Sequence, residues 1–80
     1  MDRSWAEYRY TTKRVDDPSE GWAAIELHRA KNGSAATNRV ARVIFWDAQG
    51  QFFIEAFGEE IPLSIAEELI AEAKTEIRTK

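Results

Sequence analysis

Residues 39–57 read RVARVIFWDAQGQFFIEAF, and this stretch decides the fold. The tetrapeptide DAQG at 47–50 is typical of a type I turn followed by glycine in the left-handed region, which closes a hairpin. It predicts that a strand over 39–47 pairs with a strand over 51–57. Both strands carry apolar residues at consecutive positions, and neighbouring residues on a strand point to opposite faces. Large side chains are therefore expected on both faces of the sheet.

Two further strands are expected upstream of this hairpin. Residues 5–15 alternate aromatic and β-branched side chains with charged ones, a period of two that indicates a half-buried strand. The turn-forming residues DDPSEG at 16–21 end this strand, and the alternation resumes over 22–30. The small polar residues at 31–38 are long for a hairpin connection, so this loop is expected to be mobile.

The C-terminal part of the chain predicts an amphipathic helix. The tetrapeptide SIAE at 64–67 reads as a capping box, in which Ser64 caps a free amide and Glu67 reaches back to the cap residue. Pro62, just before it, is expected to end the preceding strand. Apolar residues recur at three- and four-residue spacing and form one stripe: Ala66, Leu69, Ile70, Ala73 and Ile77. Basic residues complement the negative end of the helix: Lys74, Arg78 and Lys80.

The expected order of elements is therefore β-β-β-β-α. Because the connections between strands are short, the sheet is expected to be antiparallel. Residues 1–80 then form a single small α+β domain, a four-stranded meander with one C-terminal amphipathic helix packed on one face. A chain of 80 residues is too short for two such domains.

The helix can cover only one face of this sheet, so the apolar residues of the other face need an explanation. The residues expected under the helix are Ile25, Leu27, Val43 and Phe45. The residues expected on the far face are Trp22, Glu26, His28, Arg42, Ile44 and Trp46. The far face could pack against a second copy in a homodimer, could dock a peptide, protein or nucleic acid, or could be covered by Trp5 and the terminal segments. We favour a partner, because large exposed apolar patches on monomers are usually used.

Charge is distributed unevenly along the chain. The formal net charge of −3 disfavours a general attraction to nucleic acid. Residues 28–42 nevertheless contain no acid and four bases, Arg29, Lys31, Arg39 and Arg42. Phosphate contacts from these residues, with a base stacked on Trp46 or Tyr10, would suit a single-stranded nucleic acid. The expected order of elements also resembles, in topology alone, that of the single-stranded-DNA-binding coactivator and the Whirly-type proteins.

No pattern in the chain points to catalysis, a metal or a cofactor. His28 is the only histidine and there is no cysteine, so a metal site or a general base would need carboxylates that stand at no recognisable spacing from it. None of the serines lies in a nucleophile-elbow pattern, and the glycines form no phosphate-binding loop. We therefore expect a protein that is not an enzyme, with no catalytic residue, no metal site and no cofactor.

The same composition indicates where the protein works. No apolar run is long enough for a membrane helix, and the N-terminal residues lack the apolar core of a signal peptide. The absence of cysteine suits a reducing compartment. We expect a cytoplasmic protein with no membrane partner.

The sequence thus predicts a non-enzymatic module that binds protein or assembles as a homodimer through its open sheet face. The alternative is a single-stranded nucleic-acid-binding protein that uses the basic 28–42 hairpin and the aromatic residues of the sheet. The residues expected to bind the partner are Trp22, His28, Arg29, Lys31, Arg39, Arg42, Ile44 and Trp46.

Overall fold

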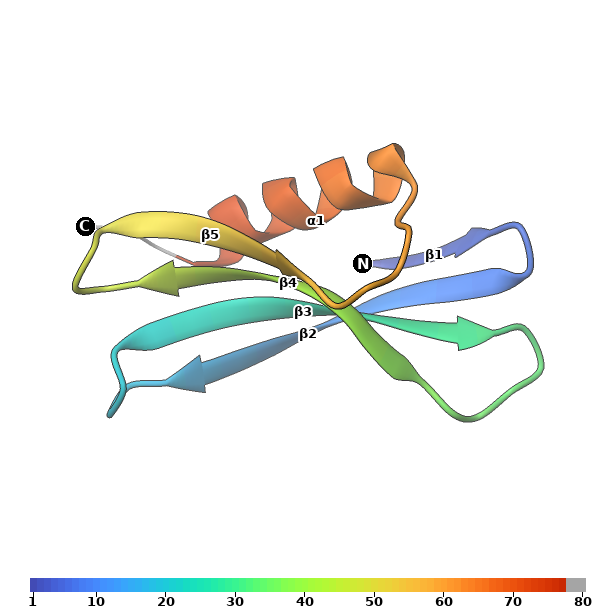
Figure 1. The fold of residues 1–80 in the computed structure, drawn as a ribbon, viewed down its shortest axis with the longest axis horizontal. Helices are drawn as coiled ribbons and strands as arrows, with labels where there is room; N and C mark the ends of the chain where they lie inside the picture. Colours follow the sequence, from blue (N-terminus) through green and yellow to red (C-terminus); the bar gives the residue numbers. More distant parts are fainter. Residues whose placement is uncertain (78–80) are drawn as a thin grey trace.

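A five-stranded antiparallel sheet and one helix make up the computed structural model, which describes residues 1–77 (Figure 1). The elements are β1 (Asp2–Trp5), β2 (Tyr8–Asp17), β3 (Trp22–Lys31), β4 (Asn38–Trp46), β5 (Gln51–Ala56) and α1 (Leu63–Glu76). The strands lie side by side in the order in which they occur in the chain. The expected α+β class, with an antiparallel meander and a C-terminal helix, is confirmed.

The expected number of strands is wrong, because the segment predicted as the first strand contains a turn. Trp5 pairs with Tyr8, and the chain reverses at Ala6 and Glu7, where Ala6 has a positive φ of 54°. Neither residue is a usual turn former, so the local composition does not predict a turn here. A tertiary contact supports it, since the Glu7 carbonyl accepts a hydrogen bond of 2.8 Å from the Asn32 amide. The fifth strand also removes the four-strand order on which the topological resemblance rested.

The turn at 47–50 has the predicted conformation. The amides of Gln49 and Gly50 donate to the Trp46 carbonyl at 3.1 and 2.9 Å, and Gly50 has a φ of 61°. In the left-handed region glycine avoids the steric cost that other residues meet. The resulting pairing joins β4 to β5, with Ile44 opposite Phe53.

A bulge in β4 changes which residues reach the core. Leu27 lies opposite Ala41 but His28 lies opposite Arg39, so Val40 has no residue opposite it. Val40 and Ala41 are both fully buried in the core cluster, although strict alternation would have sent them to opposite faces. The strand changes direction in this region (Figure 1). The bulge therefore brings Arg39 onto the same face as His28.

The buried core joins the helix to the middle of the sheet. Its fully or nearly fully buried members are Tyr10, Ile25, Leu27, Val40, Ala41, Val43, Ile65, Leu69, Ala73 and Ile77. The helix lies along one side of the sheet in Figure 1, and its backbone packs most closely against β3 and β4. Phe45 is partly buried against the same cluster.

The start of the helix differs from the prediction. Pro62 is the N-cap residue, the helix begins at Leu63, and no side chain caps it. The Pro62 carbonyl instead accepts hydrogen bonds from the amides of Ile65 and Ala66, both at 3.0 Å. Ser64 therefore lies inside the first turn, and the capping box does not form. Proline suits this position because its extended backbone leads into the helix and the cap amide would have no helical partner.

The apolar stripe of the helix is rotated slightly from the predicted one. Ile65, Leu69 and Ala73 are its buried members, whereas Ile70 is 37% exposed. Lys74 lies in the last turn, as expected, and Arg78 and Lys80 lie outside the described residues.

We predict that Ser64→Ala changes the free energy of unfolding by less than about 0.5 kcal/mol, because the hydroxyl caps nothing. Leu69→Ala, a deletion in the buried core, should cost about 2–5 kcal/mol. Urea unfolding followed by far-ultraviolet circular dichroism measures both values. A loss of about 1 kcal/mol or more in Ser64→Ala would show that the capping box forms after all.

Candidate functional site

The candidate site is the sheet face that carries no residue of the buried cluster shared with the helix, here called the open face. Because Ile25, Leu27 and Val43 point into the core, their neighbours on β3 and β4 point the other way. Cross-strand partners share a face, so the register groups the side chains in pairs. These pairs are Trp22 with Trp46, Ala24 with Ile44, Glu26 with Arg42, His28 with Arg39, Ile44 with Phe53, and Arg42 with Glu55.

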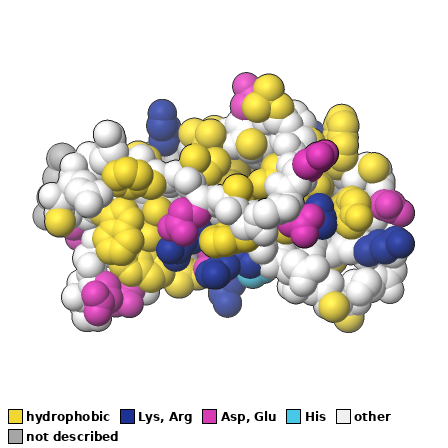
Figure 2. Space-filling view, viewed as in Figure 1, with side chains coloured by type: hydrophobic (Ala, Val, Ile, Leu, Met, Phe, Trp, Pro, Cys, Tyr) yellow, Lys and Arg dark blue, Asp and Glu magenta, His cyan; other side chains and the backbone are white. Residues whose placement is uncertain are grey.

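Three aromatic side chains gather at one end of the open face. The rings of Trp22 and Trp46 lie 6.3 Å apart and are tilted by 55°. Phe53 on β5 is 44% exposed, and Ile44, opposite it on β4, is fully buried. Trp22, Trp46 and Phe53 are here called the aromatic cluster. Figure 2 shows hydrophobic side chains gathered at the end of the molecule that carries the β4–β5 turn.

Five ionisable side chains cross the middle of the open face and form an ionic belt: Glu26, His28, Arg39, Arg42 and Glu55. The guanidinium of Arg42 donates two hydrogen bonds to Glu55 Oε1, at 2.8 and 3.0 Å. The same group lies 5.3 Å from the centre of the Trp22 ring, where a cation is attracted by the aromatic face. Arg42 therefore links the ionic belt to the aromatic cluster.

Glu26 is the most buried member of the belt, with only 8% of its surface exposed. Arg39 donates to one of its oxygens at 3.0 Å, and the His28 ring nitrogen lies 3.1 Å from the other. Burial opposes ionisation of this carboxyl, but the contacts with Arg39 and His28 outweigh it and hold the pKa of Glu26 below its ordinary value.

The four basic residues of 28–42 do not lie together on one face of the sheet. Arg39 and Arg42 lie on the open face, but Arg29 lies on the helix side, opposite Tyr10. Lys31 stands at the end of β3. The predicted set is thus divided between two faces and a strand end.

Each of these four cations also has a carboxylate partner. The pairs are Arg29 with Glu59 at 3.1 Å, Lys31 with Glu7 at 3.9 Å, Arg39 with Glu26 at 3.0 Å and Arg42 with Glu55 at 2.8 Å. These acids come from other parts of the chain. The basic character of the stretch is therefore a property of the sequence and not of the folded surface.

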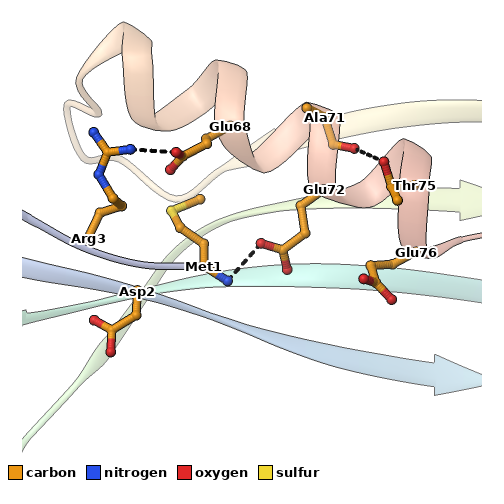
Figure 3. A pocket seen from close by; sticks show the side chains of 8 residues that line it. All are labelled: Met1, Asp2, Arg3, Glu68, Ala71, Glu72, Thr75 and Glu76. Atoms are coloured by element: carbon orange, nitrogen blue, oxygen red, sulfur yellow. Dashed lines mark hydrogen bonds and ion pairs between the residues drawn. The ribbon is translucent and has the colours of Figure 1, made fainter.

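The N-terminal segment does not cover the open face. Trp5 lies opposite Tyr8, on the helix side of the sheet, and is 52% exposed. Arg3 bonds to Glu68 and the Met1 amino group to Glu72, both on α1 (Figure 3). These contacts line an open hollow between β1 and α1 that sequence reasoning missed, because its two sides are more than 60 residues apart in the chain. The idea that Trp5 folds over the open face is wrong.

We predict that Glu26→Gln destabilises the protein at pH 7 by about 1–3 kcal/mol, because Arg39 and His28 lose a charged acceptor. The lowered pKa of Glu26 adds stability above the unfolded-state pKa of about 4.3, and this stability is lost as the pH falls through the lower folded-state pKa. The difference between wild type and variant should therefore shrink below about pH 4 in urea unfolding. Glu67→Gln, at an exposed helix position, is the control and should show no such difference. A pH-independent difference for Glu26→Gln would contradict the assignment.

The described residues also show how far the fold suits a membrane span or a metal site. Within residues 1–77, no helix is long and apolar enough to cross a membrane. Across the same residues, no group of three or more His, Cys, Asp or Glu side chains is placed to hold a metal ion. Comparisons with family models, with curated proteins and with solved structures found no match for this chain.

Proposed function

We propose that this domain is a non-enzymatic self-association module, and that its open face is the interface with a second copy of the chain. The observation that carries the proposal is the aromatic cluster on the open face. In this proposal, α1 covers the helix side of the sheet and leaves the open face uncovered. A protein of this kind, without cysteine, suits the cytoplasm.

The aromatic cluster has the chemistry of a protein interface. Tryptophan and arginine are the residues that most often carry binding energy between proteins, and they do so from closely packed sites near the interface centre. Trp22, Trp46 and Arg42 form such a group, with Ile44 buried beside them. Two sheets that pack face to face lie about 10 Å apart, so side chains of this size would interdigitate between them.

The ionic belt favours a second copy as the partner. It holds two glutamates and two arginines, each bonded within its own chain. A two-fold axis would bring this balanced set against itself, so no unpaired charge need be buried. The open face is therefore complementary in charge to its own copy.

Nucleic acid is a weaker candidate on the same evidence. Phosphate binding depends on cations that are free to replace counterions. Arg39 and Arg42 already bind Glu26 and Glu55, and Arg29 lies on the other side of the sheet. We therefore do not propose the nucleic-acid function.

We predict that Trp46→Ala raises the dissociation constant of open-face association at least about tenfold, because it removes an aromatic anchor. Light scattering behind a sizing column, at low and high protein concentration, measures the mass. Trp5→Ala is the matched control, because it removes an exposed tryptophan from the helix side of the sheet.

Circular dichroism shows whether each variant is folded, and Phe53→Ser is a milder second change in the same cluster. Equal masses for the wild type, Trp46→Ala and Phe53→Ser would contradict the proposal. Binding of a single-stranded oligonucleotide that weakens with salt and with Arg39→Ala would favour the alternative function.

A further inference from the structure

β5 is an edge strand with exposed apolar side chains on both of its faces. It pairs with β4 on one side, and in the described part of the chain no strand lies on its other side. Phe53, on the open face, is 44% exposed and Ile54, on the helix side, is 55% exposed. We propose that the free edge of β5 is a strand-pairing site for β5 of a second copy, antiparallel, with the two-fold axis at Ile54. This interface is separate from the open face, and either can fail without the other.

The backbone of β5 shows which groups are free to pair. The Phe57 amide donates to the Val40 carbonyl at 3.0 Å, in the same register that puts Glu55 opposite Arg42. In an antiparallel ladder every second residue bonds to the partner strand, so Glu55, Phe53 and Gln51 bond toward β4. The amides and carbonyls of the alternate residues, Phe52, Ile54 and Ala56, therefore point away from the sheet.

These outward groups are self-complementary about Ile54. An axis at that residue puts Ile54 opposite its own copy and Phe52 opposite the copy of Ala56. Every residue in these pairs presents its amide and carbonyl to the other strand, so the whole edge can bond. A shift by one residue would instead oppose inward-facing groups to outward-facing ones, so the registers that can bond differ by two residues, and the axis at Ile54 is one of them.

The side chains agree with the same register. The two Ile54 side chains meet on the helix side, and Phe53 faces the copy of Glu55 on the open face. Glu55 is the only charged residue in β5, and Arg42 of its own chain neutralises it. No like charges meet across the axis, and this self-complementarity of charge is the reason a second copy is the expected occupant.

The opposite edge of the sheet provides a comparison within the same molecule. β1 is only four residues long and carries Asp2 and Arg3, which form ion pairs with Arg9 and Glu68. Short length and charged side chains are the usual protections of an edge against pairing. β5 has six residues, neither lysine nor proline, and one charge, Glu55, which Arg42 neutralises, so its edge is less protected than that of β1.

Apolar surface continues from β5 onto the near side of the helix. Glu68 and Glu72 contact the β1 side, so Leu63 and Ile70, across the helix from them, lie on the β5 side. Leu63 is 75% exposed and Ile70 is 37% exposed. Hydrophobic side chains show between the helix and β5 in Figure 2. A paired β5 edge would bring a second copy alongside this surface.

Because the chain has no cysteine, single-cysteine variants can report the register directly. Opposite residues in a bonded antiparallel pair have Cα atoms about 5.5 Å apart, within the range of a disulfide. We expect Ile54→Cys to form a covalent dimer under mild oxidation. Phe53→Cys is the matched control. With the axis at Ile54, the two copies of residue 53 are offset by two residues along the strands, too far apart to form a disulfide. Cross-linking of Phe53→Cys equal to or greater than that of Ile54→Cys would overturn the register.

Light scattering then separates the edge from the open face. With both surfaces in use and their two-fold axes meeting at right angles, the assembly closes and the wild type should reach four times the 9.2 kDa chain mass. Ile54→Lys places like charges at the axis and should halve this mass, whereas Trp5→Lys, an exposed position on the opposite edge strand, should not. Trp46→Ala should also halve it, and the double variant should be a monomer.

The outcomes distinguish the two proposals. A dimer that survives Ile54→Lys and dissociates in Trp46→Ala overturns the edge and leaves the open face. A dimer with the opposite behaviour supports the edge alone. A wild-type monomer at every concentration overturns both.

Discussion

The structure depends on a mismatch between one helix and a sheet that is apolar on both faces. One buried cluster joins Ile65, Leu69 and Ala73 of α1 with Ile25, Leu27 and Val43, which share one face of the sheet. β4 nevertheless places Ile44 and Trp46 on the other side, because its apolar residues are consecutive. A chain of this size buries only roughly 60–65% of the surface that it exposes when unfolded, so surface left over on a second face matters to its stability.

Within the single chain, large amphipathic side chains cover part of this second face. Arg42 lies over Trp22 and bonds to Glu55, and the two tryptophans lie against each other. Ile44 and Ala24 are fully buried as a result, although neither is in the core cluster. The bulge at Val40 also contributes, because it places Arg39 on the open face, where its guanidinium donates a hydrogen bond to Glu26. Without Arg39, the buried carboxylate of Glu26 would have only His28 as a partner, and burying a poorly paired charge is costly.

The sequence predicts those parts of the fold that depend on local chemistry. The turn at 47–50, the helix and the strand that begins at Trp22 follow from residue type and spacing, and they hold in the structure. The turn at Ala6 and Glu7 could not be predicted, because its support comes from Asn32 in another hairpin. The capping box failed because Pro62 was available one residue before the helix as a backbone cap.

The same distinction applies to the candidate site. Its apolar members, Trp22, Ile44 and Trp46, could be assigned to one face from periodicity alone. The basic stretch could not be interpreted in this way, because the charge of a surface depends on residues from neighbouring strands. Arg42 is basic in the sequence and neutralised in the fold, since β5 places Glu55 directly opposite it.

A meander leaves two free edges, and this chain treats them differently. The contacts of β1 with α1 engage charged side chains, so that edge is closed by ion pairs. β5 pairs with β4, and its large exposed side chains, Phe53 and Ile54, are apolar. Phe53 on the open face and Ile54 at the β5 edge therefore present apolar surface that the isolated chain does not bury. For a small domain, association is the physical route to burying such surface, because a larger assembly encloses a greater share of its surface than a single chain can.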